Sequence, residues 1–236
     1  MTTFDLIDRY LFDCVSTALH RGANGGCSCG SMVEEMNEIR ESYRNGASIE
    51  DVLNKCVCNR HGHQYCIATA AVEAAAKALK EASFVCSRMC KVPFVDAGKI
   101  YSGFNDFEEL YDFIKSVIGE IKGIGSLTVY DTAKRIGHLL DTPIYPKMYV
   151  YLAAGAKKGA ESLLGKKDLH FREPIDYFKP HFGTLPSIFI EDMLCIFENE
   201  LNGSTRNVMT GETEITIPTA NAGAAYSKPS TMIGAI

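Results

Sequence analysis

IGEIKGIGSLTVYDTAKRIG, residues 118–137, is the most informative segment of this chain. Two glycines flank a single apolar residue, Ile124, and apolar residues recur at helical spacing on both sides of this turn. Those before the turn, in a helix that Asp106 is expected to cap, are Phe107, Leu110, Tyr111, Ile114 and Ile118. Those after the turn are Val129, Ala133, Ile136 and Leu140. The pattern predicts a helix, a tight turn and a second helix.

The predicted turn is suited to binding a phosphate. Gly123 and Gly125 allow positive φ values and a close approach of backbone to ligand, while Ile124 is expected to plug the turn into the core. The amides that begin the second helix lack intrahelical acceptors, and a helix N-terminus favours an anion. Ser126 and Thr128 either cap that helix or donate to the same phosphate. The alternative is a turn that joins two core helices without a ligand.

Residues 122–133, KGIGSLTVYDTA, resemble the hairpin of the helix-hairpin-helix DNA-binding motif, known best from DNA glycosylases and related repair proteins. The resemblance extends more loosely over residues 107–200, where the order of helices is similar to that of the glycosylase superfamily. It implies that DNA is the partner. The expected DNA-binding residues are Lys122, Gly123, Ile124, Gly125, Ser126, Thr128, Lys157 and Lys158.

The sequence departs from the glycosylase pattern at two places. Glycosylases that also cleave the strand resemble one another in a lysine just after the second glycine, where this chain has Ser126 and Leu127, so Schiff-base lyase chemistry is not expected. The family's catalytic aspartate falls on residues 145–147, and the nearest aspartate is Asp141. A glycosylase built on this chain is therefore expected to be monofunctional and to take its carboxylate from elsewhere.

Asp192 is the candidate for that carboxylate. Cleavage of an N-glycosidic bond needs a carboxylate that stabilises the developing positive charge on the sugar and orients water, acting on a base extruded from the stack. Asp192 and Glu191 lie in an apolar helix expected over residues 186–201, where a carboxylate can be partly buried. A solvent-facing carboxylate pair is the alternative. His63 and Gln64 are the candidates for hydrogen-bonding or acid-base groups.

Cysteines and histidines cluster in the first third of the chain. Zinc takes four such ligands, and the thiols that could supply them are Cys27, Cys29, Cys56 and Cys58. The C-x-C spacing differs from the usual C-x2-C, so a structural zinc, a substrate site that uses His63 and Gln64, and ordinary packing all stay open. We expect no metal or other cofactor.

Composition limits the partners and the location of the protein. The chain of 236 residues carries 24 Lys+Arg against 29 Asp+Glu, a net charge of -5, which argues against coating nucleic acid by bulk charge. Residues 115–180 nevertheless hold 11 Lys+Arg against 7 Asp+Glu. Charged residues interrupt the N-terminus, and the longest apolar run, residues 148–156, is too short to span a bilayer. We expect a cytosolic protein with reduced thiols and no membrane partner.

The remaining patterns predict a mainly α, multi-helix globular fold. Further helices are expected near the N-terminus, after Ser31, over residues 63–84 and over residues 147–164, where small residues would admit a neighbouring helix closely. Three regions follow, namely an N-terminal helical region with Cys/His loops (1–92), the helix-hairpin-helix region (93–201) and a polar, extended tail (202–236).

The sequence as a whole predicts a DNA-binding protein of the helix-hairpin-helix type. Whether it is also an enzyme stays open, and a monofunctional glycosylase-like hydrolase acting on a modified or damaged base is the catalytic form of the hypothesis. The alternatives are a non-catalytic DNA-binding or adaptor module and a small nucleoside or nucleotide enzyme that uses the turn for a single phosphate. Binding to several DNA phosphates weakens steeply with salt, which separates these classes.

Overall fold

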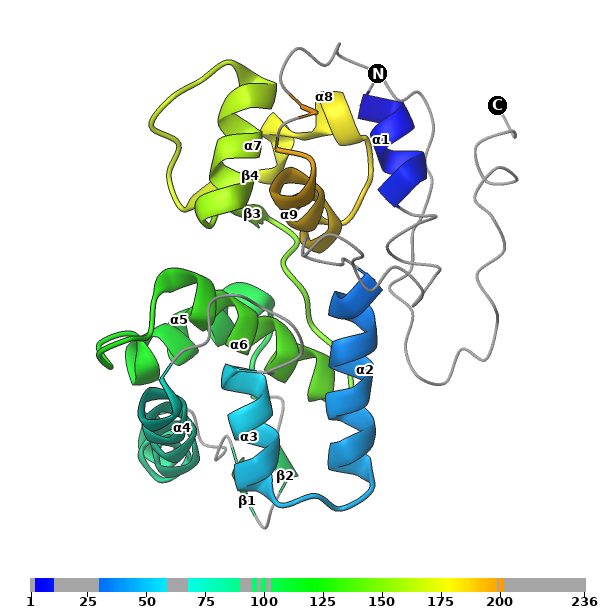
Figure 1. The fold of residues 1–236 in the computed structure, drawn as a ribbon. Helices are drawn as coiled ribbons and strands as arrows, with labels where there is room; N and C mark the ends of the chain where they lie inside the picture. Colours follow the sequence, from blue (N-terminus) through cyan, green and yellow to red (C-terminus); the bar gives the residue numbers. More distant parts are fainter. Residues whose placement is uncertain are drawn as a thin grey trace. The chain divides into compact units, whose positions relative to one another are not determined.

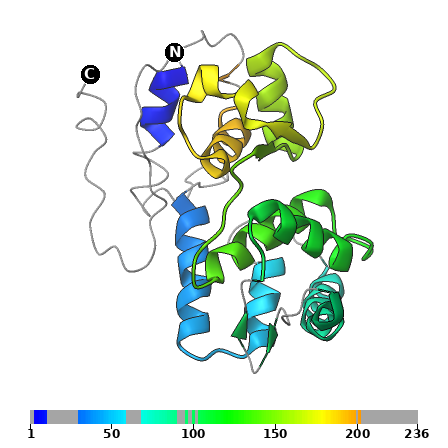
Figure 2. The same cartoon turned by 180° about the vertical axis from the view of Figure 1, so that it is seen from behind.

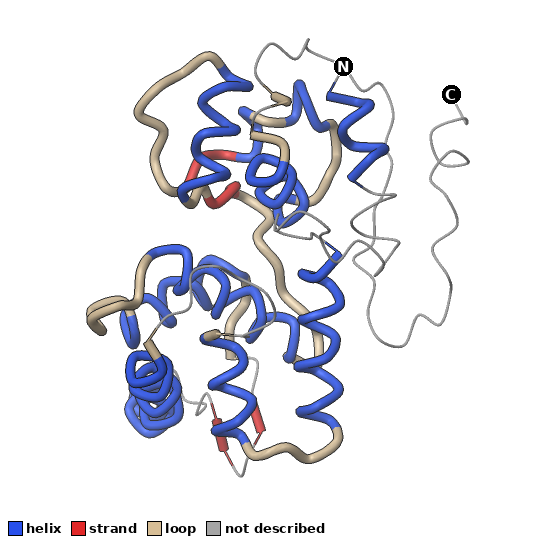
Figure 3. The backbone as a smooth tube through the Cα atoms, in the orientation of Figure 1, coloured by secondary structure: helices blue, strands red, loops and turns tan. Residues whose placement is uncertain are grey.

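The chain is mainly helical and forms two compact units, one of residues 35–145 and one of residues 1–34 with 146–236. Figure 3 shows helices throughout both units and only short pairs of strands. In this computed structural model the described residues are 3–10, 30–58, 68–89, 95–96, 99–100, 103–198 and 200–201. The mainly α prediction is confirmed.

The unit of residues 35–145 is built around helix α6. Helices α5 and α3 both pack on α6, and α4 packs on α3 and α5 (Figures 1 and 2). The strands β1 and β2 pair antiparallel, with Val95 opposite Ile100. The bounds of these elements are α2 (Gly30–Arg44, which begins just before this unit), α3 (Ile49–Val57), α4 (Thr69–Met89), β1 (Val95–Asp96), β2 (Lys99–Ile100), α5 (Phe107–Ile118) and α6 (Ser126–Leu139).

Local sequence explains where two of these helices begin. Asp106 caps α5 as expected, because its Oδ1 accepts a hydrogen bond from the amide of Glu109 at 2.9 Å. Helix α3 was not expected, and the structure shows that Ser48 caps it by accepting a hydrogen bond from the amide of Asp51 at 3.1 Å. The buried residues of α3 are Val52, Leu53, Cys56 and Val57.

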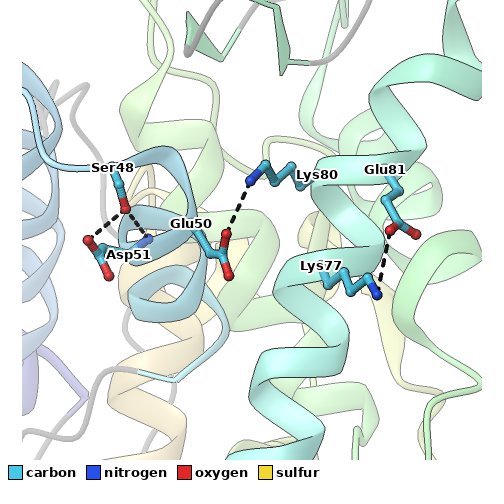
Figure 4. A network of polar contacts seen from close by, with 6 residues as sticks. All are labelled: Ser48, Glu50, Asp51, Lys77, Lys80 and Glu81. Carbon is cyan, nitrogen blue, oxygen red and sulfur yellow. Dashed lines mark hydrogen bonds and ion pairs between the residues drawn. The ribbon is translucent and has the colours of Figure 1, made fainter.

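The solvent-facing side of α3 and α4 carries several separate polar contacts (Figure 4). Lys80 reaches across from α4 to Glu50 of α3 at 3.1 Å, and Lys77 lies 3.9 Å from Glu81 one turn along α4. All four side chains are exposed, so each pair contributes less than about 1 kcal/mol to stability. Apolar burial between the two helices therefore holds them together.

The second unit combines short helices with one antiparallel strand pair. In that pair Val150 lies opposite Glu173. The expected helix over 147–164 begins only at Ala154, since Tyr149–Tyr151 form a strand, as aromatic and β-branched residues favour. The bounds are α1 (Thr3–Tyr10), β3 (Tyr149–Tyr151), α7 (Ala154–Leu164), β4 (Arg172–Pro174), the 3-10 helix η2 (Ile175–Tyr177), α8 (Lys179–Phe182) and α9 (Ser187–Ile196).

Helices α7 and α9 approach each other closely through glycine. A Cβ on Gly155 would lie 2.7 Å from Sγ of Cys195, and one on Gly159 would lie 2.0 Å from the carbonyl oxygen of Leu194. The expectation that the small residues of α7 admit a neighbouring helix is confirmed. Helix α9 itself is shorter than expected, because it ends at Ile196 rather than near residue 201.

The predicted regions 1–92, 93–201 and 202–236 stay a prediction, and residues 202–236 lie outside the described residues. The boundaries between the two compact units lie between residues 34 and 35 and between residues 145 and 146. Within the described ranges, no helix has both the length and the apolar character that crossing a bilayer requires.

Candidate nucleic-acid interface

The predicted hairpin lies between the two expected helices, with α5 ending at Ile118 and α6 beginning at Ser126. Gly123 has a φ of +95°, which a side chain would strain, and Ile124 is 8% exposed and therefore packs into the core as expected. Gly125 differs from the expectation. Its φ of -99° is ordinary extended backbone, because it is the N-cap residue of α6 rather than part of the reversal.

The N-terminus of α6 has free amides. The amide of Val129 is the first that donates along this helix, to the carbonyl of Gly125 at 3.0 Å, so the amides of Ser126, Leu127 and Thr128 precede the intrahelical ladder. The N-cap residue is Gly125, which has no side chain, so Ser126 and Thr128 lie within the first turn of α6 rather than at the capping position. Residues 125–127 are exposed. An anion can therefore reach these amides.

Fewer cations surround the hairpin than the sequence suggested. Lys134 is buried, 3.0 Å from Asp131 and 4.6 Å from the centre of the Tyr130 ring, and Arg135 is buried against Glu35 at 2.9 Å. Both cations therefore interact with groups of the same unit rather than with solvent. Of the lysines nearest the turn, Lys115 and Lys122 are exposed, and so is the carboxylate of Glu120.

Tyr130, one turn into α6 and close to the hairpin in sequence, is a core residue. Its ring is fully buried and lies edge-on to Phe107, with the ring centres 6.0 Å apart. Base stacking on this tyrosine is thereby excluded.

Two of the expected DNA-binding lysines belong to the other compact unit. Lys157 is half-buried on α7 and lies 3.9 Å from Glu161 one turn along, and Lys158 is exposed. The hairpin residues Lys122, Gly123, Ile124, Gly125, Ser126 and Thr128 lie together in the unit of residues 35–145. Of the expected DNA-binding residues, these six therefore form one local group, and the hairpin is the candidate site.

The candidate catalytic carboxylate takes part in a tertiary hydrogen bond. The hydroxyl of Tyr10, on α1, donates to Oδ2 of Asp192, on α9, at 2.8 Å, and Asp192 is half-buried. Its neighbour Glu191 is 5% exposed, so the solvent-facing carboxylate pair is wrong for Glu191. The other two candidates, His63 and Gln64, lie outside the described residues.

The thiols that the sequence offered to zinc do not form a site where the structure describes them. Cys56 lies in the last turn of α3, fully buried, and burial raises the pKa of its thiol to about 12. Cys58 is half-buried just after that helix, whereas Cys27 and Cys29 lie outside the described ranges. In the described part of the chain no three His, Cys, Asp or Glu side chains are grouped to hold a metal ion.

A polar cluster that sequence reasoning missed lies at the opposite end of α6 from the hairpin. His138, which is fully buried, has Nδ1 2.5 Å from Oη of Tyr145 and Nε2 3.0 Å from Oδ1 of Asn37. Burial, with smaller contributions from the positive charges of Arg40 and Arg44, lowers the pKa of His138 to about 4. The signal in the sequence was the spacing of Asn37, Arg40 and Arg44 along one helix face.

The other unit exposes aromatic rings beside cations. Nζ of Lys166 lies 4.4 Å from the ring centre of Tyr177, and the guanidinium of Arg172 lies 5.9 Å from that of Tyr149. Both tyrosines are among the exposed large side chains of the described residues. Cation–π contacts of this kind fix surface side chains and indicate no ligand by themselves.

Comparison of the chain with protein-family models, with curated proteins and with solved structures finds no match. The helix-hairpin-helix resemblance accordingly depends on residues 122–133 and on the geometry of the turn that they form. The function has to be argued from this site.

Proposed function

We propose that this chain binds DNA through the phosphate backbone, with the hairpin of residues 122–128 as the contact. The observation that carries the proposal is the exposed turn in which Gly123 reverses the chain at positive φ, Ile124 anchors it and α6 begins with three amides that have no intrahelical acceptor. Free amides at a helix N-terminus, with the positive end of the helix dipole, suit a phosphate.

The charges around the hairpin favour a local contact with few phosphates. The chain as a whole is acidic, with a net charge of -5, and Lys134 and Arg135 are occupied inside the protein. Lys122, exposed beside the turn, is the cation positioned to add to the amides. A contact of one or two phosphates per strand gives modest affinity that is insensitive to base sequence.

The non-catalytic form of the proposal has the better support. Oδ2 of Asp192 accepts a hydrogen bond from Tyr10, so this carboxylate already has a structural task in joining α1 and α9. The catalytic form, a monofunctional glycosylase, requires that Asp192→Asn abolishes base release from modified DNA while duplex binding persists, with no borohydride-trapped adduct in either protein. Absence of base release in the native protein leaves the binding module as the function.

A carboxylate introduced next to the α6 amides tests the proposal. A Cβ on Gly125 meets nothing within 4 Å and its φ suits any residue, so Gly125→Asp fits without strain. Aspartate is a favoured N-cap and complements the helix dipole, so the variant should be about 0.5 kcal/mol more stable than the native protein. The same carboxylate repels the phosphate and occupies its amides. Duplex affinity should fall at least about tenfold, or 1.4 kcal/mol.

Gly125→Asn is the matched control, because asparagine caps equally well without adding charge. Fluorescence anisotropy with a short duplex, at several salt concentrations, should rank the native protein above Gly125→Asn and both above Gly125→Asp. Equal affinity of all three proteins would contradict a phosphate contact at the hairpin. So would a loss of affinity in Gly125→Asp that is matched by a loss of stability.

A further inference from the structure

Exposed apolar side chains gather at one place in the unit of residues 1–34 with 146–236. Four large apolar side chains are exposed among the described residues, and three of them, Met148, Tyr149 and Tyr177, belong to this unit. The fourth, Leu127, lies in the hairpin. A single exposed apolar residue is ordinary, whereas several that adjoin one another mark an interaction surface.

Backbone pairing brings these three residues into one neighbourhood. Tyr149 lies opposite Pro174 in the β3–β4 pair, and the amide of Ile175 donates to the carbonyl of Met148 at 3.0 Å. Tyr177 ends the 3-10 helix that begins at Ile175. Met148, Tyr149 and Tyr177, named the aromatic patch from here on, therefore come from two adjoining backbone segments.

Each ring of the aromatic patch has a cation over it and still faces solvent. Nζ of Lys166 lies 4.4 Å from the ring centre of Tyr177, and the guanidinium of Arg172 lies 5.9 Å from that of Tyr149. Tyr177 is 43% exposed and Tyr149 36% exposed with these cations in place. The cations fix the orientation of the rings and keep positive charge beside them, while the rings stay accessible to a ligand.

Lysines around the aromatic patch carry charge that the protein does not neutralise. Lys147, Lys166 and Lys167 are exposed, and in the part of the chain that the structure describes none of them takes part in an ion pair. Lys147 precedes Met148 directly, and Lys166 lies over the ring of Tyr177. One exposed carboxylate, that of Asp168, follows Lys167. Positive charge therefore exceeds negative charge at this surface.

Two further carboxylates of the same segment are engaged within the protein. Glu173 is 6% exposed, and its Oε1 accepts a hydrogen bond from the amide of His170 at 2.6 Å. Asp176 pairs with Lys179 at 2.6 Å. These carboxylates leave the three lysines to an external anion.

We propose that the aromatic patch and its lysines bind single-stranded nucleic acid. Tyr149 and Tyr177 would each stack on a base, and Lys147 and Lys166 would contact the phosphates beside it. Unpaired bases offer flat apolar faces next to negative charge, which is the combination that this surface complements. The bases of a duplex cover one another's faces, and the carboxylates of an acidic peptide offer no such face to a ring. The inference does not rest on the hairpin, which belongs to the other unit.

Titration of the full chain with two labelled single strands tests the proposal. A short oligo-dT presents unpaired bases that stack little on one another, and an abasic strand of the same length carries the same phosphates without bases. Fluorescence anisotropy should show affinity for oligo-dT about tenfold or more above that for the abasic strand, since stacking on two tyrosines adds to the phosphate contacts. Equal affinity for the two strands would overturn the proposal.

Substitutions in the aromatic patch separate stacking from charge. Tyr177→Ala and Tyr149→Ala should each lower oligo-dT affinity about fivefold or more, and Tyr177→Phe should stay within about twofold of the native protein, because stacking needs the ring and not the hydroxyl. The Tm of each variant shows that the protein remains folded. Native affinity for oligo-dT in both alanine variants would contradict the proposal.

A lysine substitution tests the phosphate contact. Lys166→Met should weaken binding of oligo-dT and of the abasic strand alike, by about threefold, because it removes a cation whatever the base. Lys77→Met is the control, since Lys77 is an exposed cation of the other unit that pairs with Glu81, and it should bind both strands as the native protein does. Equal behaviour of the two variants would contradict a phosphate contact at Lys166.

Two comparisons keep this proposal apart from the hairpin and from a protein partner. Tyr177→Ala should bind duplex DNA normally, and Gly125→Asp should keep its preference for oligo-dT over the abasic strand, so the two proposals fail independently. A peptide of alternating Glu and Leu should bind more weakly than oligo-dT. Preference for that peptide would overturn the proposal and assign the aromatic patch to an acidic protein partner.

Discussion

Gly159 of α7 faces the carbonyl oxygen of Leu194 on α9 so closely that a Cβ on the glycine would lie only 2.0 Å from that oxygen. A contact between a glycine Cα and a backbone carbonyl lets two helices approach more closely than any side chain would allow. One turn earlier, Gly155 faces Sγ of Cys195, and its Cβ would lie 2.7 Å from that atom. These two glycines set the spacing on which the α7–α9 core depends.

Gly159→Ala should destabilise the protein more than Gly155→Ala. The first substitution pushes against backbone, which can yield only if α7 and α9 separate, and should cost about 3 kcal/mol or more. The second meets a side-chain sulfur that can rotate away, and should cost about 1 kcal/mol. Urea unfolding of both variants measures the difference. Equal costs would show that α7 and α9 separate readily.

Arg135→Met should cost about 3–5 kcal/mol, because it leaves the buried carboxylate of Glu35 and the carbonyl of Cys56 without the donor that now serves both at 2.9 Å. Lys80→Met is the control, since Lys80 pairs with Glu50 at the exposed surface shown in Figure 4 and should cost less than about 1 kcal/mol. Chemical denaturation of the two variants compares their losses in the free energy of unfolding. Similar losses in both variants would contradict the structural role of Arg135.

Stability should fall as the pH drops from about 6.5 to about 4. Burial lowers the pKa of His138 from 6.5 to about 4, so over this window the unfolded chain takes up a proton that the native protein does not. This contribution to the free energy of unfolding is fully present above pH 6.5, the pKa of the histidine in the unfolded chain. It is lost as the pH falls to about 4, the pKa of His138 in the folded protein, and amounts to at most about 3 kcal/mol.

Urea unfolding across this pH range, in a buffer without phosphate, measures the effect of His138. His138→Gln should flatten the pH dependence of the unfolding free energy, whatever its absolute stability, because glutamine does not titrate. An undiminished slope in His138→Gln would assign the effect to other groups.

Native Cys56 should resist alkylation far more than Cys195. The thiol of Cys56 is fully buried with its pKa raised to about 12, so almost no thiolate is present or reachable at neutral pH, whereas Cys195 is exposed. Peptide mass spectrometry after timed iodoacetamide treatment compares the two sites. Rapid labelling of Cys56 in the folded protein would contradict its position inside α3.

Periodicity was enough to predict the elements that bury one regular face. The apolar face of α5, its Asp106 cap and the turn at Gly123 could be predicted because each depends on a few neighbouring residues. The strand at Tyr149–Tyr151 could not, since it exists only through pairing with Arg172–Pro174. Helix α3 had a readable signal in Ser48 and Asp51, which the cysteine pattern after it obscured.

The sequence predicted only the part of the candidate site whose residues are neighbours along the chain. The hairpin follows from five consecutive residues, 122–126, and one later threonine. Of the cations near it in sequence, Lys134 and Arg135 do not add to a basic surface, because they pair with Asp131 and Glu35. The polar cluster of Asn37, His138 and Tyr145 needs residues from α2, from α6 and from the segment beyond α6. No spacing along the chain brings those three segments together.

An NMR titration of the ¹⁵N-labelled full chain with a short DNA duplex is the sharpest test of the hairpin as a DNA contact. We predict that the largest amide shifts fall on Gly125–Thr128, where α6 begins, with smaller ones at Lys122 and Gly123, and that added salt reverses them together. Saturable duplex binding that leaves these amides unmoved, or no duplex binding at low salt, would contradict a contact between this hairpin and the DNA backbone.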